Sequence, residues 1–276
     1  MEGLNILFAS DMHGNKIQYN KLFDYAAKNS FDLLILGGDI TPKDAVNRTP
    51  QKQEEFLEKY LFKKILEFTK KSKIKILIIL GNDDFRSNEE ILKKNQSKGY
   101  MYIGQKSTIF EKLSIIGYSY VPITPFKFKD WEKHDLSNKK EDRKDILMEG
   151  LVNAGLKKSF KLTDRKDNIE TDLNKLAIDK HAVLVSHSPP YNTNLDILID
   201  DRHVGSEALR KIIVEKQPLL VLSGHIHETV RISGKYSDKI GKTICLCTGN
   251  DNLSENIALI EININGSKIS FKRLII

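Results

Sequence analysis

The chain has 276 residues, of which 40% are hydrophobic and 29% charged, as is typical of a globular protein that buries a sizeable core. No apolar run approaches the ~20 residues that a membrane-spanning helix needs. Residues 1–4 lack the basic flank and the apolar stretch of a signal peptide. We therefore expect a cytoplasmic protein without a membrane partner.

The formal net charge of +7 is compatible with nucleic acid as a partner. The excess is mostly lysine scattered through the chain, however, without the interleaved aromatic residues that would stack bases. A nucleic-acid partner is therefore possible but not favoured, although a basic surface would attract any phosphorylated substrate.

The first third of the chain alternates short apolar runs with segments of helical periodicity. In order, the predicted elements are a strand at 4–9, a helix around 19–26, a strand at 31–36, a helix around 57–68 and a strand at 74–80. Such alternation is typical of a sheet whose parallel strands are joined by crossover helices.

The middle of the chain breaks this pattern. Short strands are predicted at 108–111 and 113–118, and residues 126–175 are then polar and irregular, with a helix expected near 145–154. We interpret 126–175 as an insertion or cap rather than a separate domain. The expected organisation is therefore a single domain over residues 1–276 that carries this insertion.

The C-terminal part is rich in strands. The predicted strands lie at 181–185, 219–222, 243–247, 256–264 and 267–274. Ser206 is a plausible N-cap for a helix between the first two, and Asn265-Gly266 indicates a hairpin turn between the last two. The whole pattern predicts an α/β fold with a mixed two-sheet core and helices outside.

Five polar clusters directly follow predicted strands. They are Asp11-Met12-His13, Gly37-Gly38-Asp39, Gly81-Asn82-Asp83-Asp84, Ser186-His187-Ser188 and Gly224-His225-Ile226-His227. Because ligands of open α/β sheets bind at the carboxyl ends of strands, we expect these clusters to form one site. Asp11 and His13 are two residues apart in an extended segment, so their side chains point to the same side, about 7 Å apart along the backbone.

The residue types in these clusters are those that bind transition metals. Carboxylate oxygen, amide oxygen and imidazole nitrogen together suit Mn, Fe, Zn, Co or Ni better than Ca or Mg alone. A carboxylate such as Asp39 can bridge two ions about 3.5–4 Å apart. The predicted ligands of a two-metal site are Asp11, His13, Asp39, Asn82, His187, His225 and His227.

The motif series D-x-H, G-G-D, G-N-x-D, H and G-H-x-H, within residues 4 to about 262, resembles that of the calcineurin-like metallophosphoesterases. The resemblance implies a four-layer αββα sandwich of two mixed sheets flanked by helices. It implies two divalent transition-metal ions, the first held by Asp11, His13, Asp39 and His227 and the second by Asp39, Asn82, His187 and His225. It also implies a bridging hydroxide that hydrolyses a phosphomonoester or phosphodiester, with a small phosphorylated molecule or a nucleotide as substrate.

One position departs from the family pattern. The family's third motif has a histidine that protonates the leaving group or steadies the transition state, and this chain has Asp83 there. Either Asp83 acts as the acid with a raised pKa, or His203, in the loop after the His187 motif, supplies the proton. In a third alternative no acid is needed, because aryl esters and many phosphodiesters of nucleotides leave with little help. A metal-stabilised interaction module without turnover and a metal-dependent nuclease remain alternative functions.

Three residues are candidates for binding the substrate. Arg86 could bind a phosphate in bidentate fashion, and Asn15 and the predicted ligand Asn82 could line the site. Asn15 and Arg86 also have ordinary turn or surface explanations. Trp131 and the aromatic residues near it could stack a base or an aryl group, or pack the insertion against the core.

Overall fold

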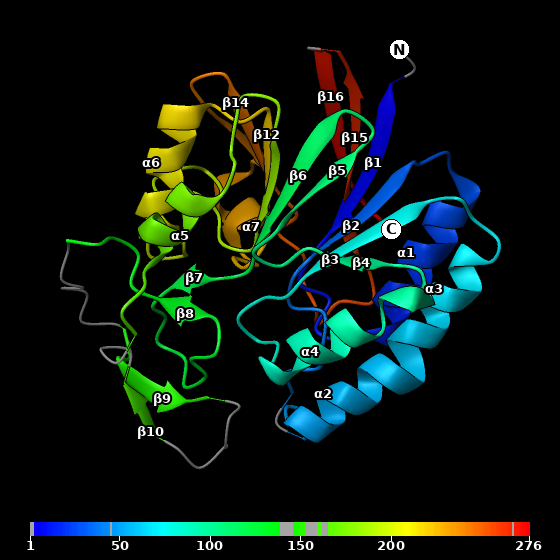
Figure 1. Ribbon diagram of the computed structural model, residues 1–276, viewed down its shortest axis with the longest axis horizontal. Coiled ribbons are helices and arrows are strands. Elements are labelled where there is room, and N and C mark those ends of the chain that lie inside the picture. Colours follow the sequence, from blue (N-terminus) through cyan, green and yellow to red (C-terminus); the bar gives the residue numbers. More distant parts are fainter. Residues whose placement is uncertain (1–2, 45, 139–145, 153–158, 162–164, 267) are drawn as a thin grey trace.

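The computed structural model describes residues 3–44, 46–138, 146–152, 159–161, 165–266 and 268–276. Two six-stranded mixed sheets lie face to face and helices cover their outer faces, which confirms the expected four-layer αββα sandwich (Figure 1). Among the residues described, no helix is long and apolar enough to cross a membrane.

The first sheet is built around parallel strands from the N-terminal part of the chain. In spatial order its strands are β16 (Lys268–Ile275), β15 (Ala258–Asn265), β1 (Leu4–Ala9), β2 (Leu33–Gly37), β3 (Lys75–Ile79) and β4 (Met101–Tyr102). Because β1, β2 and β3 run parallel, their carboxyl ends lie side by side. The predicted hairpin turn joins β15 to β16, and Gly266 there has a left-handed φ of 61°.

The second sheet is built from later parts of the chain. In spatial order its strands are β13 (Ser237–Ile240), β14 (Thr243–Cys247), β12 (Leu220–Ser223), β11 (Val183–Ser186), β6 (Leu113–Tyr118) and β5 (Ser107–Phe110). The four central strands are parallel, whereas β13 and β5 are antiparallel edges. The carboxyl ends of β11 and β12 are therefore neighbours.

Alternation of side chains along the strands divides the core into two parts. Ile6 and Phe8 of β1 belong to the apolar cluster between the sheets, together with Val185 of β11. Leu7 of β1 instead packs in the cluster beneath the helices, together with Leu22. Because these strands are buried on both faces, they appear in the sequence as continuous apolar runs.

The helices lie on both sides of the two sheets (Figure 1). Along the chain they are α1 (Lys16–Lys28), α2 (Pro50–Phe56), the π-helical turn η1 (Leu57–Leu61), α3 (Phe62–Thr69), α4 (Ser87–Lys94), the 3-10 turn η2 (Gln96–Lys98), α5 (Ile169–Lys175), α6 (Glu207–Lys216) and α7 (Thr229–Ser233). The Ser206 hydroxyl accepts a hydrogen bond from Leu209 N at 2.9 Å, which confirms the predicted N-cap of α6.

The predicted insertion connects β6 to β11. It contains the short strands β8 (Glu132–Lys133), β9 (Glu149–Leu151) and β10 (Ser159–Lys161), and it ends in α5, while β7 (Val121–Pro122) precedes it. The helix expected near 145–154 is wrong over 149–151, because Leu151 N donates to Lys127 O at 2.7 Å and β9 pairs with β10. Residues 145, 153 and 154 lie outside the described part of the chain. That residues 1–276 form one domain stays a prediction.

A fully buried ion pair fixes the start of this insertion. Lys129 Nζ donates to Glu132 Oε2 at 2.6 Å and to Thr124 O at 2.8 Å, and both charged side chains are 0% exposed. Glu132 Oε2 also accepts from Thr124 N at 2.9 Å. Burial raises the pKa of Glu132 to about 7, against the opposing effect of Lys129. The conformation of the segment around Thr124 therefore depends on the Lys129 ammonium and the Glu132 carboxylate together, because either charge alone would be buried without a partner.

We expect Lys129→Met to destabilise the protein in a pH-dependent way, by about 3–5 kcal/mol near pH 8. Without the ammonium group, the pKa of Glu132 in the folded state lies even further above its unfolded value. The free energy of unfolding is then retained at a pH below the pKa of Glu132 in the unfolded chain. It is lost as the pH rises through the pKa of Glu132 in the folded protein. Urea unfolding at pH 5 and pH 8 measures this, with Lys127→Met, at an exposed position, as the matched control. Equal unfolding free energies of Lys129→Met and wild type at pH 8 would contradict it.

Candidate metal centre

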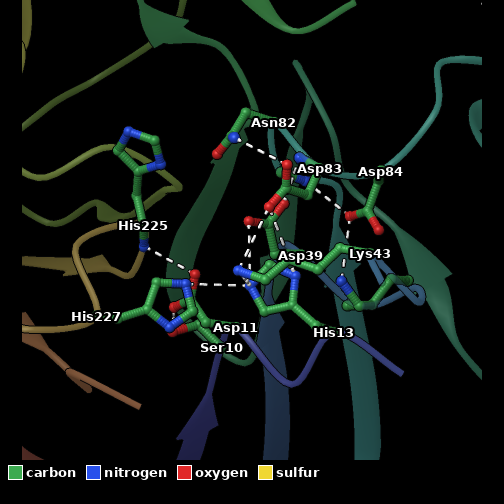
Figure 2. A network of polar contacts seen from close by, with 12 residues as sticks. Ser10, Asp11, His13, Asp39, Lys43, Asn82, Asp83, Asp84, His225 and His227 are labelled. Carbon is green, nitrogen blue, oxygen red and sulfur yellow. Dashed lines mark hydrogen bonds and ion pairs between the residues drawn. The ribbon is translucent and has the colours of Figure 1, made fainter. Parts of the chain in front are cut away.

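The five polar clusters meet where the strand ends of the two sheets come together. The loops after β1, β2 and β3 approach from the first sheet, and the loops after β11 and β12 approach from the second. Figure 2 shows labelled side chains from the loops after β1, β2, β3 and β12 in the neighbourhood of Asp39. Asp11, His13, Asp39, Asn82 and His187 are buried, and His225 and His227 are partly buried.

The backbone is strained at four of the predicted ligands. Asp11, His13, Asp39 and His225 have left-handed φ values of 57°, 44°, 51° and 71°. Such conformations cost roughly 1–3 kcal/mol per residue and cluster at functional sites. Two cross-loop hydrogen bonds hold them, from Asp11 N to Gly38 O at 3.0 Å and from His13 N to Asp39 O at 2.8 Å. The extended segment expected at Asp11 and His13 is therefore wrong, because left-handed turns occupy both positions.

Two histidine rings are oriented by backbone carbonyl groups. Nδ1 of His187 lies 2.9 Å from Gly37 O, and Nδ1 of His227 lies 2.8 Å from Asn250 O. A carbonyl oxygen only accepts, so each Nδ1 carries the proton and donates. This turns each Nε2 toward the other donor atoms, where it can bind a metal ion once it carries no proton.

The free donor atoms converge. Nε2 of His13 lies 3.1 Å from Nε2 of His227, and Nε2 of His187 lies 3.1 Å from Asn82 Oδ1. Asp39 Oδ2 lies 3.6 Å from Nε2 of His13 and 3.4 Å from Nε2 of His187. Asp39 therefore connects the two groups of donors, as a bridging carboxylate does.

The donor set fits divalent metal ions. One donor atom from each of Asp11, His13 and His227 lies within 4.8 Å of the others. The same holds for Asp11, Asp39 and His187, and for His13, Asp39 and Asp83. His225 approaches the second of these groups, since its ring centroid lies 5.3 Å from that of His187.

Two glycines keep the space around these donors open. A Cβ atom at Gly81 would collide with Asp39 Oδ1 and would lie 2.5 Å from His187 Nε2. A Cβ atom at Gly224 would collide with Asp11 Oδ2. Only glycine allows the backbone this close to the ligand atoms, which explains the residues that precede Asn82 and His225 in their motifs.

Burial and charge set the protonation of the histidines. Burial lowers the pKa of His225 to about 3 and holds the pKa of His13 well below its usual range, so both rings are neutral at pH 7. Burial also lowers the pKa of His187, but the charge of Asp39 outweighs this effect and raises that pKa to about 10. Because a ligand imidazole must be neutral, metal binding at His187 displaces a proton.

The two aspartates of the Gly81–Asp84 motif have different surroundings. Asp84 is buried and accepts hydrogen bonds from Thr41 N at 2.8 Å and Gly81 N at 2.9 Å, so it ties the loop after β2 to the loop after β3. Asp83 faces the site, and its backbone N donates to Asp39 Oδ1 at 2.7 Å. Burial and the charge of Asp39 raise the pKa of Asp83, while Arg48 opposes them.

A cavity of about 250 Å³ opens beside the predicted ligands. The predicted ligands Asp39, Asn82, His225 and His227 line it together with Asp83 and Lys43. The other lining residues are Pro122, Ile123, Thr124, Pro125, Phe126, Leu198, Arg202, Val204, Ile226 and Glu228. The cavity beside the predicted metal centre is therefore lined by both donor groups and apolar side chains.

His203 is turned away from this cavity. Its Nδ1 lies 2.8 Å from Asp196 Oδ1, and its ring packs edge-on against Tyr191. Arg202 and Val204, on either side of it, line the cavity, while His203 is not among the described lining residues. Because side chains alternate in an extended segment, the two neighbours face the cavity and His203 faces the opposite way.

Asn15 and Arg86 also have other partners. Asn15 is the N-cap of α1, where its Oδ1 accepts from Ile17 N at 3.0 Å, and its Nδ2 donates to Asn252 O at 3.0 Å. Arg86 is exposed and lies over Trp131, with its Cζ atom 5.5 Å from the ring centroid. An N-cap contact and an aromatic face thus give each side chain a structural partner, in line with the ordinary turn or surface explanation for these two residues.

Three further residues next to the site were not predicted from the sequence. Lys43 Nζ lies 3.1 Å from His13 Nε2, Arg48 donates to Asp83, and Asn250 orients His227 and donates from Nδ2 to Asp11 O at 3.1 Å. Lys43 and Arg48 lie in a loop without periodicity. Thr49-Pro50, an N-cap followed by proline, does mark the start of α2 and could have placed Arg48 at the end of the loop that begins at Asp39.

The fold and the site together define a metal-binding αββα protein with carboxylate and imidazole donors at its strand ends. The family model of the calcineurin-like phosphoesterases matches residues 4–229. The chain therefore belongs to the calcineurin-like phosphoesterase family, whose members are metal-dependent and act on phosphorylated substrates. The match ends before β13–β16, which complete both sheets.

One relative in sequence and several solved structures are similar to this chain. A stretch of 69 residues is 49% identical to the uncharacterized protein MJ1162 of Methanocaldococcus jannaschii and covers 24% of this chain and 29% of that protein, which is less than a third of its length. The crystal structure of TT1561 of Thermus thermophilus has a TM-score of 0.59 at 15% identity and covers 98% of both chains. Another crystal structure has a TM-score of 0.63 at 15% identity. The match covers 98% of this chain and 99% of the chain in that structure. At this identity the structures support the fold alone.

We expect Mn²⁺ to stabilise the protein against unfolding, by about 2.7 kcal/mol at one hundred times its dissociation constant. Asp39→Asn should remove most of this effect, because the shared ligand loses its charge. His181→Asn, at an exposed position, is the matched control and should retain the effect. Thermal unfolding with and without Mn²⁺ measures the stabilisation. If Mn²⁺ stabilises Asp39→Asn against unfolding as much as it stabilises the wild type, Asp39 is not a metal ligand.

Proposed function

We propose that this protein hydrolyses phosphate esters with two divalent transition-metal ions drawn from Mn, Fe, Zn, Co and Ni. Asp39 would bridge them, with Asp11, His13 and His227 as the other ligands of one ion and Asn82, His187 and His225 as those of the second. The observation that carries the proposal is the convergence on Asp39 of donor atoms from five separate loops. When bound, such ions activate a water molecule as the nucleophile and neutralise the phosphate oxygens.

The protein's own residues would prepare this chemistry. Gly37 O and Asn250 O hold His187 and His227 in the tautomer that exposes Nε2. Burial keeps His13 and His225 neutral, so that they can act as ligands at neutral pH. Lys43 lines the cavity and brings a positive charge toward an incoming phosphate group.

The leaving group is expected to depart without a histidine. His203 lies on Asp196 rather than in the cavity, and Asp83 accepts a hydrogen bond from Arg48 at 2.5 Å. This favours esters whose leaving groups are stable without a proton, such as aryl esters and phosphodiesters of nucleotides.

The cavity of about 250 Å³ suits a small phosphorylated molecule or a nucleotide better than a nucleic-acid duplex. Phosphatase and phosphodiesterase activities both remain within the proposal, and a cytoplasmic location stays a prediction from the sequence.

We expect the purified protein with Mn²⁺ to hydrolyse p-nitrophenyl phosphate or bis(p-nitrophenyl) phosphate and to lose this activity in EDTA. His225→Ala should lower kcat by at least about 100-fold, since even residues that only orient metal ligands contribute 10- to 100-fold. His203→Gln is the matched control and should keep the wild-type rate, because its side chain does not line the cavity. Release of p-nitrophenolate measures both.

Two other outcomes would assign a different function. Stabilisation by metal without hydrolysis, across several metals and a wide panel of phosphate esters, would indicate an interaction module. Metal-dependent cleavage of DNA with salt-sensitive binding would indicate a nuclease.

A further inference from the structure

Three charged residues form a compact cluster beside the predicted metal centre, which we call the Asp83 cluster: Lys43, Arg48 and Asp83. Arg48 Nη2 lies 2.5 Å from Asp83 Oδ1, and Lys43 Nζ lies 3.6 Å from Asp83 Oδ2. The side chain of Asp83 is 11% exposed, that of Arg48 18% and that of Lys43 29%. The position at which the family has a neutral or singly charged histidine here carries a carboxylate with two cations around it.

Arg48 is held from two directions. Its guanidinium lies over Phe128, with Cζ 4.0 Å from the ring centroid, a cation–π contact. Phe128 in turn packs edge-on against Phe85, with 5.3 Å between the ring centroids. Asp83 then fixes the direction in which the guanidinium points. An arginine restrained by both an aromatic face and a carboxylate is preorganised for binding an anion.

Arg48 also has hydrogen-bonding capacity to spare. The guanidinium has five N–H donors, and Asp83 is its hydrogen-bond partner within the described part of the chain. The buried Nε has no partner there. Unpaired buried donors are unfavourable, so a ligand that accepts hydrogen bonds would satisfy them.

Lys43 has two alternative partners at this place. Its Nζ lies 3.1 Å from Nε2 of His13, a predicted metal ligand, and 3.6 Å from Asp83. The single lone pair of Nε2 can serve either the ammonium group or a metal ion, but not both. With a metal ion on His13, the remaining partner of Lys43 within the cluster is Asp83. Asp83 would then anchor two cations, of which Lys43 lines the cavity and Arg48 contacts Asp83, which also lines it.

We propose that Arg48 binds the phosphoryl group of the substrate and stabilises its charge in the transition state, and that Asp83 is the residue that positions Arg48. The inference rests on the proposed phosphoesterase function. Arg48 would replace the electrostatic role of the family's histidine but not its acid role, because an arginine stays protonated throughout. The preferred substrates are therefore phosphate esters whose leaving groups need no proton.

The test uses the full-length, Mn²⁺-loaded protein and a series of aryl phosphodiesters with leaving groups of different acidity. Arg48→Ala should lower kcat by about 100- to 1000-fold, the usual effect of losing one transition-state hydrogen-bond donor. Guanidinium chloride at millimolar concentration should restore part of the rate, and Arg48→Lys should retain part of it. Mn²⁺ affinity, measured by calorimetry, should change less than about twofold, since Arg48 is not among the converging donor groups.

Arg86→Ala is the matched control, because Arg86 also lies over aromatic rings, but over those of Tyr120 and Trp131 rather than beside Asp83. It should leave kcat and KM unchanged and should not respond to guanidinium. Asp83→Asn should lower kcat in the same direction as Arg48→Ala with a similar dependence on the leaving group. The Arg48→Ala/Asp83→Asn double variant should be about as slow as the slower single variant, because the two residues act as a unit.

The outcomes separate this inference from the proposed function. If the wild type hydrolyses the esters and Arg48→Ala has the same kcat and KM, Arg48 does not bind the substrate. Loss of Mn²⁺ affinity together with activity in Arg48→Ala would assign Arg48 to the architecture of the metal centre and also overturn the inference. If the wild type is inactive, the proposed function fails, and calorimetry with inorganic phosphate still decides the role of Arg48. Phosphate should bind Arg48→Ala at least about tenfold more weakly than wild type, and equal affinity would refute the inference.

Discussion

The carboxylate of Asp39 is the contact on which the rest of the site depends. It lies at the end of a central strand of the first sheet, faces His13 from the neighbouring loop, and faces His187 from the second sheet. Its other oxygen accepts from the backbone of Asp83. One residue therefore joins both sheets and the loop in which this chain departs from its family. The left-handed turn at Asp39 and the missing Cβ at Gly81 are the local conditions for this geometry.

The segment that leads into the insertion lines the cavity with residues 122–126. The buried Lys129–Glu132 pair, within the insertion, fixes this segment through its contacts with Thr124. Phe128, next to this pair, supports the guanidinium of Arg48. The insertion thus contributes packing and orientation, while the strand-end loops contribute the donor atoms.

Much of this could be predicted from the sequence because strands and metal ligands leave periodic or clustered patterns. The apolar runs indicated the parallel strands, and the five polar clusters identified the loops that converge in the structure. Contacts between segments of irregular structure could not be predicted in this way. Arg48 and Lys43 reach the site from a loop without periodicity, and His203 is directed away by the alternation of an extended segment. The helix expected near 145–154 is wrong over 149–151, because these residues pair as a strand with β10 and Leu151 N donates to Lys127 O.

Anomalous diffraction from crystals soaked with Mn²⁺ would show whether seven side chains hold two metal ions bridged by Asp39. We expect two anomalous peaks about 3.5–4 Å apart. One peak should lie among Asp11, His13 and His227, the other among Asn82, His187 and His225, with the Asp39 carboxylate between them. A single peak, or peaks away from these side chains, would be incompatible with a two-metal centre at Asp39.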